Sequence, residues 1–216
     1  MPLKLFKLNG SPPARAVMMM TEILGLPVEM QDVNFFEKEH TSPEYLKMNP
    51  LHTVPVLVDE VLVIHDSHAA LMYLSDKYGK NDSLYPKDIK KRTLINQQLF
   101  FNNSILFTRL RNVTYPAITA GPLKITQSQI NDIVEAYGFV EEFLSRTKYL
   151  ATDDMTIADI AAFATVSSLE HLVPIEEKFN KTKAWLTKMG SEPFASKANS
   201  NGLAEFGLLV QKFVLR

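Results

Sequence analysis

Ser11 stands at a place in the sequence where a hydroxyl group could do chemistry. It follows Asn9 and Gly10, and we expect a helix to begin just after it at Pro12 or Pro13, because proline fits the first turn of a helix. A serine hydroxyl can donate a hydrogen bond to an anion, and a helix N-terminus favours negative charge. The residues alone are compatible with such a role and also with an ordinary helix N-cap.

Cysteine is absent from the 216 residues of the chain. Its absence excludes structural disulfides, CxxC redox chemistry, cysteine–zinc sites and a cysteine nucleophile. If this protein performs thiol chemistry, the thiol must belong to a ligand. We expect no metal site.

Composition and charge indicate a globular protein with one large or two small domains. Hydrophobic residues make up 46% of the chain, and 23 basic against 24 acidic residues give a formal net charge of −1. No excess positive charge is available for nucleic acid or an anionic membrane. No run of about 18 apolar residues could span a membrane, and lysines interrupt any signal-peptide core near the N-terminus. We therefore expect a soluble, cytoplasmic protein.

The first 80 residues have the pattern of a small α/β domain. Apolar and polar residues alternate in a first strand, a helix ends at Gly25, a second strand follows, and two apolar runs around Asp59 and Glu60 predict a hairpin. Asp66 and Ser67 then cap another helix. This βαβ–ββα order predicts one four-stranded mixed sheet with helices on its faces.

The remainder of the chain reads as a separate helical domain. Residues 81–86 are polar and contain Pro86, so we interpret them as the linker between a domain over 1–80 and a domain over 87–216. Apolar residues beyond the linker recur at helical intervals, and no segment resembles a strand. Thr156 and Asp159 form a variant of the capping box, which predicts the start of a buried helix over Ile157–Leu172.

Short motifs follow one another in a fixed order along essentially the whole chain. They are Ser11–Val17, Glu39-His40, Met48–Leu57, Asp66–Ala69, Tyr78, Ser83–Pro86, Leu106–Arg111 and Thr156–Asp159. Each motif alone is weak, but their joint order and spacing resemble the cytosolic glutathione transferases, and specifically the insect epsilon class with its delta relatives. The resemblance implies a thioredoxin-like first domain and an all-helical second domain.

The resemblance also implies roles for the first domain's residues toward glutathione as co-substrate. Ser11 would be the catalytic residue that stabilises the thiolate. Val54 and Pro55 would be joined by a cis peptide bond, although X–Pro bonds are usually trans, and the Val54 backbone would pair with glutathione like an added strand. The full set of glutathione-binding residues implied by the resemblance is His40, His52, Thr53, Val54, Pro55, Asp66, Ser67 and His68.

Within this set, charge complementarity assigns partial roles. The Asp66 carboxylate would bind the α-ammonium of the γ-glutamyl group, while Ser67 and the helix N-terminus would bind its α-carboxylate. His40 and His52 would bind the glycine carboxylate, although single histidines in polar loops are more often solvated surface residues.

Two positions depart from the pattern of the resembling family. His68 stands where delta enzymes usually have arginine, so no permanent cation is guaranteed there. Asn102 stands where relatives often carry an acidic residue, and asparagine keeps hydrogen bonding but loses the charge. We expect Asn102 to weaken glutathione binding modestly without removing the site.

A hydrophobic electrophile pocket is expected between the two domains. Its candidate lining residues are Leu8, Pro12, Pro13 and Leu51 from the first domain, and Phe107, Arg111, Tyr115, Leu203 and Phe206 from the second. Plain core packing is an equal alternative for each helical aromatic. Arg111 would either flank the pocket and polarise a substrate or extend its charge to water.

The resemblance implies a transferase that conjugates glutathione to hydrophobic electrophiles in detoxification. The same thiolate could reduce peroxides or eliminate chloride from chlorinated insecticides, which would connect the protein to insecticide resistance. A homodimer is implied by resemblance only. The alternative is a non-catalytic carrier of hydrophobic ligands on the same fold, because fold does not fix function. A zeta-type isomerase is not expected, since those relatives carry a cysteine-containing motif.

Overall fold

The first half of the chain forms a four-stranded mixed sheet, as predicted. The computed structural model describes residues 3–215, so residues 1–2 and 216, at the outer limits of the predicted domains, lie outside it. The strands are β1 (Leu3–Lys7), β2 (Val28–Asp32), β3 (Val56–Asp59) and β4 (Leu62–Ile64), in the order β2-β1-β3-β4. β1 and β2 are parallel, and the other neighbours are antiparallel.

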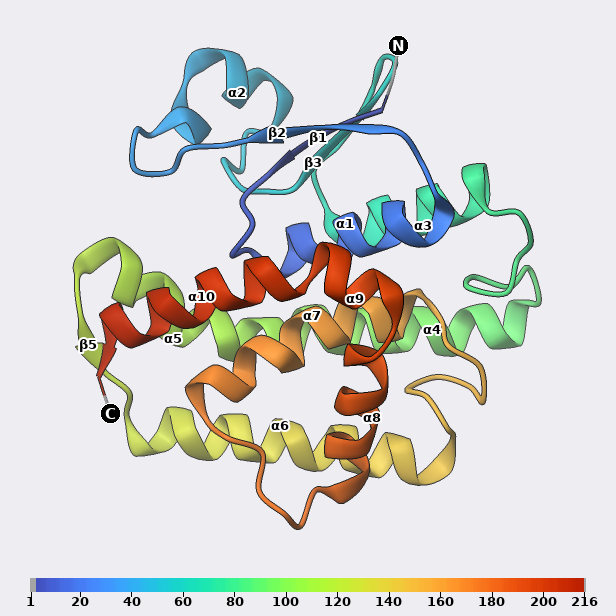
Figure 1. Ribbon diagram of the computed structural model, residues 1–216, viewed down its shortest axis with the longest axis vertical. Helices are drawn as coiled ribbons and strands as arrows, with labels where there is room; N and C mark the ends of the chain where they lie inside the picture. Colours follow the sequence, from blue (N-terminus) through green and yellow to red (C-terminus); the bar gives the residue numbers. More distant parts are fainter. Residues whose placement is uncertain (1–2, 216) are drawn as a thin grey trace.

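Helices cover both faces of this sheet. α1 (Pro12–Leu24) and α3 (Ser67–Tyr78) lie on the face turned toward the rest of the molecule, and α2 (Pro43–Met48) lies on the other side after the short 3-10 helix η1 (Glu39–Thr41) (Figure 1). Because successive side chains of a strand alternate in direction, the sheet feeds two apolar clusters, a large one on the α1 side and a small one beneath α2.

The second half is helical, as predicted, apart from two very short strands. Its α-helices are α4 (Ile89–Phe101), α5 (Thr108–Ala120), α6 (Gln127–Arg146), α7 (Ile157–Leu172), α8 (Asn180–Gly190), the short α9 (Pro193–Ala198) and α10 (Ser200–Phe213). A π-helical segment, η2 (Asn102–Phe107), joins α4 to α5. β5 (Leu123–Lys124) pairs in parallel with β6 (Val214–Leu215), which no sequence pattern had indicated because each strand has only two residues.

The buried helix α7 begins and ends at the predicted residues. Asp159 accepts hydrogen bonds from the Thr156 backbone N–H at 2.9 Å and from its hydroxyl at 3.0 Å. The other carboxylate oxygen accepts from the Leu150 N–H at 2.9 Å and from the Trp185 indole at 3.2 Å. Asp159 therefore joins three segments around the start of the central helix of this half.

The two halves share one continuous apolar core rather than touching at a thin interface. α1 packs against α7 and α9, and α3 also contacts α7. In Figure 1, α1 and α3 form a layer between the sheet and the helices α7 and α10. The loop after β1 therefore lies where the sheet domain meets the helical half.

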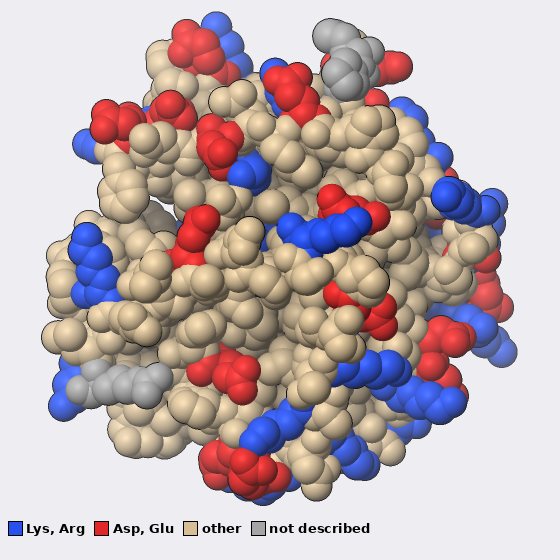
Figure 2. All heavy atoms as spheres, viewed as in Figure 1, with Lys and Arg blue, Asp and Glu red and all other residues tan. Residues whose placement is uncertain are grey.

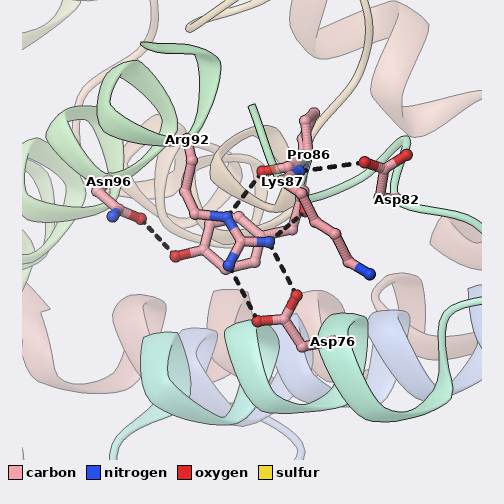
Figure 3. A network of polar contacts seen from close by, with 7 residues as sticks. Asp76, Asp82, Pro86, Lys87, Arg92 and Asn96 are labelled. Carbon is pink, nitrogen blue, oxygen red and sulfur yellow. Dashed lines mark hydrogen bonds and ion pairs between the residues drawn. The ribbon is translucent and has the colours of Figure 1, made fainter. Parts of the chain in front are cut away.

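The connection between α3 and α4 is fixed by Arg92. Its guanidinium binds both carboxylate oxygens of Asp76 at 2.9 and 3.2 Å, and it donates to the backbone oxygens of Tyr85 and Pro86 at 2.9 and 2.7 Å (Figure 3). It also stacks over the Tyr85 ring at 3.9 Å. The polar stretch interpreted as a linker is thus held against both helices that flank it.

No helix within residues 3–215 has the length and apolar character needed to cross a membrane. No group of three or more histidine, aspartate or glutamate side chains in this part of the chain could hold a metal ion.

Candidate active site

Ser11 caps α1 and lies at the junction of the two halves. Its oxygen accepts a long hydrogen bond of 3.5 Å from the Ala14 N–H, and its own N–H donates to the Leu8 carbonyl at 3.0 Å. Accepting this bond leaves the hydroxyl proton free to donate elsewhere. The capping role and the anion-binding role predicted for Ser11 are therefore compatible, beside the positive end of a 13-residue helix.

The loop that carries Ser11 is held by a chain of polar contacts. The buried Lys7 ammonium binds Asp32 at 2.6 Å and Asn9 at 2.5 Å. The Asn9 amide then donates to Glu205 of α10 at 3.1 Å. These contacts fix the loop to both β2 and the last helix. No local pattern indicated them, because Asn9 and Glu205 are 196 positions apart.

The Val54–Pro55 peptide bond is cis. The family resemblance implied this, although most X–Pro bonds are trans. The segment before it is organised by Asn49, which is fully buried. The Asn49 amide donates to the Thr53 carbonyl at 2.8 Å and to its hydroxyl at 3.0 Å, and Tyr45 donates to the same carbonyl at 2.6 Å. Sequence reasoning missed Asn49, although an asparagine before a proline is a turn signal.

His40 and His52 lie near each other on the α2 side of the sheet. Their ring centroids are 6.2 Å apart, and the His40 ring stacks on Phe35 at 4.0 Å. Burial, together with nearby His52, lowers the pKa of His40. Its Nδ1 is buried and has no hydrogen-bond partner among the described residues.

Asp66, Ser67 and His68 form the N-terminus of α3. Asp66 accepts from the Ala69 N–H at 2.8 Å as the N-cap, and Ser67 is buried. His68 meets Asn102 of η2, with 2.9 Å between Nε2 and the amide nitrogen. The two positions that depart from the resembling family therefore contact each other across the domain junction.

The His68–Asn102 contact is uncharged. Burial lowers the pKa of His68, although nearby Asp66 acts in the opposite direction. Asn102 is 4% exposed, and its Oδ1 has no partner among the residues described. A neutral pair thus stands beside the Asp66–Ser67 cap.

The residues predicted to line the electrophile pocket are spread between surface and core. Arg111 lies over the Tyr115 ring at 4.1 Å, and both are exposed. Leu51 is also exposed, whereas Phe206 is buried with its ring against that of His171. The half-buried members are Leu8, Pro13, Phe107 and Leu203, and Pro12 is buried.

Two cavities of about 290 and 420 Å³ lie elsewhere, within the helical half. The first is lined from α7, α8, α9 and α10 and includes Leu203, Phe163 and Lys183. The second lies between α7 and α10 beside His171 and Gly207. Leu203 is the one predicted pocket residue that lines either cavity.

The face of the molecule drawn in Figure 2 is hollowed and carries charges of both signs. Figure 2 shows the molecule hollowed at the left, where the α2 side of the sheet domain faces α5. Acidic and basic side chains alternate over the same face and form no large patch of one sign. The hollow opens at the domain junction, where the loop bearing Ser11 also lies.

Comparison with known proteins identifies both halves of the chain. Residues 1–76 match the family model of the glutathione S-transferase N-terminal domain, and residues 114–193 match that of the glutathione S-transferase C-terminal domain. Glutathione S-transferase 1 of Manduca sexta is 43% identical over 205 residues, which cover 94% of each chain.

Solved structures agree in both fold and sequence. An epsilon-class glutathione S-transferase from the housefly Musca domestica has a TM-score of 0.95 and 45% identity, with 97% of each chain covered. A glutathione transferase homologue from Drosophila mojavensis with bound glutathione has a TM-score of 0.95 and 39% identity, with 99% of each chain covered. The chain therefore belongs to the glutathione S-transferase family, and its predicted resemblance to the insect epsilon class is confirmed.

Proposed function

We propose that Ser11 stabilises the thiolate of glutathione for attack on hydrophobic electrophiles. Family membership already makes the chain an enzyme that conjugates glutathione, so the proposal concerns the residues and the substrate class. The observation that carries it is the position of Ser11. Its hydroxyl proton is free beside the N-terminus of α1, at the junction of the two halves.

The energetic task of Ser11 is modest and well defined. A free thiol has a pKa near 8.5, so only a few per cent is thiolate at pH 7. Lowering that pKa by about two units requires roughly 2.7 kcal/mol. A charge-assisted hydrogen bond together with a helix N-terminus can supply most of this stabilisation.

The cysteinyl part of glutathione binds along Thr53, Val54 and Pro55. The cis bond and the contacts from Asn49 and Tyr45 hold this segment in one conformation. None of the described hydrogen bonds uses the Val54 N–H, so it remains available to a peptide laid beside it.

The charged ends of glutathione bind on either side of that segment. Asp66, Ser67 and the α3 N-terminus take the γ-glutamyl group, with His68 beside them. His40 and His52 take the glycine carboxylate, and the 6.2 Å between their ring centroids supports this assignment.

Substitution at an activated aryl chloride illustrates the reaction. The thiolate sulfur forms a bond to carbon, the carbon–chlorine bond breaks and chloride leaves, while the thiol proton has already passed to solvent. Arg111 and Tyr115 flank the electrophile from α5. This chemistry fits detoxification, and peroxide reduction or dehydrochlorination, with a link to insecticide resistance, needs the same thiolate. The non-catalytic carrier is not favoured, since the curated relatives are glutathione S-transferases and Ser11 is present at the N-terminus of α1.

We assign the working form to a cytoplasmic homodimer. β4 is an edge strand whose Leu62 is 41% exposed, and α4 exposes Leu94 and Phe100 at 46% and 68%. A two-fold dimer would pack the first domain of each chain on the helical domain of the other. Measuring the mass in solution before and after Phe100→Asp tests this assignment, and a monomeric wild type would contradict it.

Comparison of wild type with Ser11→Ala tests the catalytic assignment. We expect a loss of about 10²-fold in conjugation to an activated aryl chloride, as for removal of one anion-stabilising donor, with little change in glutathione affinity. Thr126→Ala is the matched control, because Thr126 caps α6 with a 3.2 Å bond far from the junction. Equal activity of Ser11→Ala and wild type would overturn the role of Ser11.

A further inference from the structure

Arg15 is a buried cation one helical turn from Ser11 that the reaction described so far does not use. We propose that Arg15 is a positioning residue whose unneutralised charge helps stabilise the thiolate bound at Ser11. The inference rests on the proposed role of Ser11 and extends it to the residue that sets the local electrostatic field.

Neutral groups alone hold the Arg15 guanidinium. The side chain is fully buried and donates to Asn199 Oδ1, to Ser168 Oγ and to the Ala164 carbonyl at 3.3 Å. Its Nε has no partner among the described residues. Buried arginines usually meet a carboxylate, because an isolated charge is costly to bury.

No ion pair within residues 3–215 includes Arg15. Burial lowers the pKa of Arg15 to about 9, so the group is still protonated at neutral pH. The charge is felt by its surroundings, since burial and the Arg15 charge both lower the pKa of His171, while Glu170 opposes them. The carboxylate on the facing α10, Glu205, binds Asn9.

Arg15 is also mechanically tied to the loop that carries Ser11. The Arg15 backbone N–H donates to the Ser11 carbonyl at 2.9 Å. One helical turn, about 5.4 Å along the axis, therefore separates the two residues. A Cβ added at Gly202 would lie 2.8 Å from Arg15 Cδ and 2.9 Å from the Asn9 carbonyl carbon, so the arginine stem runs close beside the loop backbone. Coulomb interactions over such distances are stronger in a protein interior than in water.

A purely structural role for Arg15 makes a different prediction about Asn199. Asn199→Asp places a carboxylate against the guanidinium, which improves the anchoring of Arg15 and suits the start of α10, where aspartate is a preferred cap. If Arg15 only clamps the halves together, this variant keeps wild-type chemistry. If the free charge matters, neutralising it weakens the thiolate.

The experiment measures the pKa of the thiol of bound glutathione from thiolate absorbance against pH. We expect Asn199→Asp and Arg15→Met each to raise this pKa by about one unit, which lowers the thiolate fraction about tenfold at pH values below it. Arg15→Lys, which keeps the charge, should lie closer to wild type. Arg92→Met is the matched control, because the charge of Arg92 is already paired with Asp76, and it should leave the value unchanged.

The outcomes separate this inference from the role of Ser11. An ordinary thiol pKa in wild type would refute the role of Ser11 and this inference with it. A lowered value in wild type that Asn199→Asp leaves unchanged would refute only the role of Arg15. A shift of equal size in Arg92→Met would also overturn it, since the effect would then not depend on the unpaired charge. Asn199→Asp decides the question even if Arg15→Met does not fold.

Discussion

Two arginines join the halves of this molecule, and their surroundings are opposite. Arg92 lies at the connection between α3 and α4, 23% exposed in its side chain, with the Asp76 carboxylate and the Tyr85 ring as partners. Arg15 lies inside the junction of α1, α7 and α10, fully buried, with only neutral partners. Arg92 therefore links two helices with its charge neutralised by a carboxylate, whereas the charge of Arg15 has no ionic partner among the described residues.

The contrast separates the contribution of an arginine to stability from its contribution to chemistry. A bidentate carboxylate partner neutralises the Arg92 charge locally, so we expect Arg92 to hold the chain without influencing Ser11. The field of Arg15 is not cancelled in this way.

Replacing each arginine by alanine should give the largest difference in unfolding free energy between the two positions. Arg15→Ala leaves a cavity in the core and an unpaired Asn199, and we expect it to lower the free energy of unfolding by about 3 kcal/mol. Arg92→Ala should cost about 1.5 kcal/mol, because its partners can turn to water. Chemical denaturation measures both. A larger loss for Arg92→Ala would mean that the connection, rather than the core, holds the halves together.

Gly202→Ala, in α10, tests how tightly this helix packs against Arg15 and the loop before α1. The added Cβ would meet the Asn9 backbone and the arginine stem at less than 3 Å, and forced overpacking of this kind costs about 2 kcal/mol. Gly138→Ala in α6 is the control, since its Cβ would touch only Phe179 at 3.8 Å, and helix propensity should make it neutral or stabilising. Equal denaturation midpoints for the two variants would show that the loop and α10 are not tightly packed.

Local signals explain which parts of the fold could be predicted from the sequence. The start of α7 was predictable because Thr156 and Asp159 are three positions apart, and the caps Ser11 and Asp66 are equally local. The π-helical η2 and the strand pair β5–β6 were not, because they depend on packing and on partners about 90 positions apart.

The candidate site also has parts that could be predicted from local sequence and parts that could not. The cis Val54–Pro55 bond and the role of Ser11 were both predicted through an ordered set of motifs, and the structure confirms the cis bond. The partners of Arg15 lie 149 to 184 positions away, and no pattern links them. One signal was present: Arg15 is a charged residue in an otherwise apolar first half of α1. Its burial could have been predicted from that position, but its lack of a carboxylate could not.

The hydrogen-bonded carboxylate of Asp59 can be compared with the two arginines by measuring stability at acid pH. Burial alone would raise the pKa of Asp59, but hydrogen bonds from Lys77, Tyr73 and Tyr78 lower it to about 2. A pKa below the unfolded value stabilises the fold above about pH 4 and loses this effect as the pH falls toward 2. We expect the stability difference between wild type and Asp59→Asn to shrink by roughly 1 kcal/mol over that window. The groups that bind the Arg15 guanidinium do not titrate, so the cost of Arg15→Ala should depend on pH only through nearby His171 and Glu170. A decline that parallels that of Asp59→Asn would contradict the distinction.

Arg92→Lys should give the smallest effect and identify what the carboxylate-paired arginine contributes. Lysine keeps the positive charge near Asp76 but loses the planar fork that also reaches the Tyr85 and Pro86 carbonyls. We expect a loss of only about 0.5 kcal/mol in unfolding free energy, since a partly exposed charge pair tolerates looser geometry. Chemical denaturation of Arg92→Lys and Arg92→Ala together measures how much of the stabilisation comes from the charge and how much from the hydrogen bonds to the two carbonyls. If the lysine variant is as unstable as the alanine variant, the hydrogen bonds to the two backbone carbonyls, and not the charge, fix the connection. Arg92 would then resemble Arg15 in depending on neutral partners.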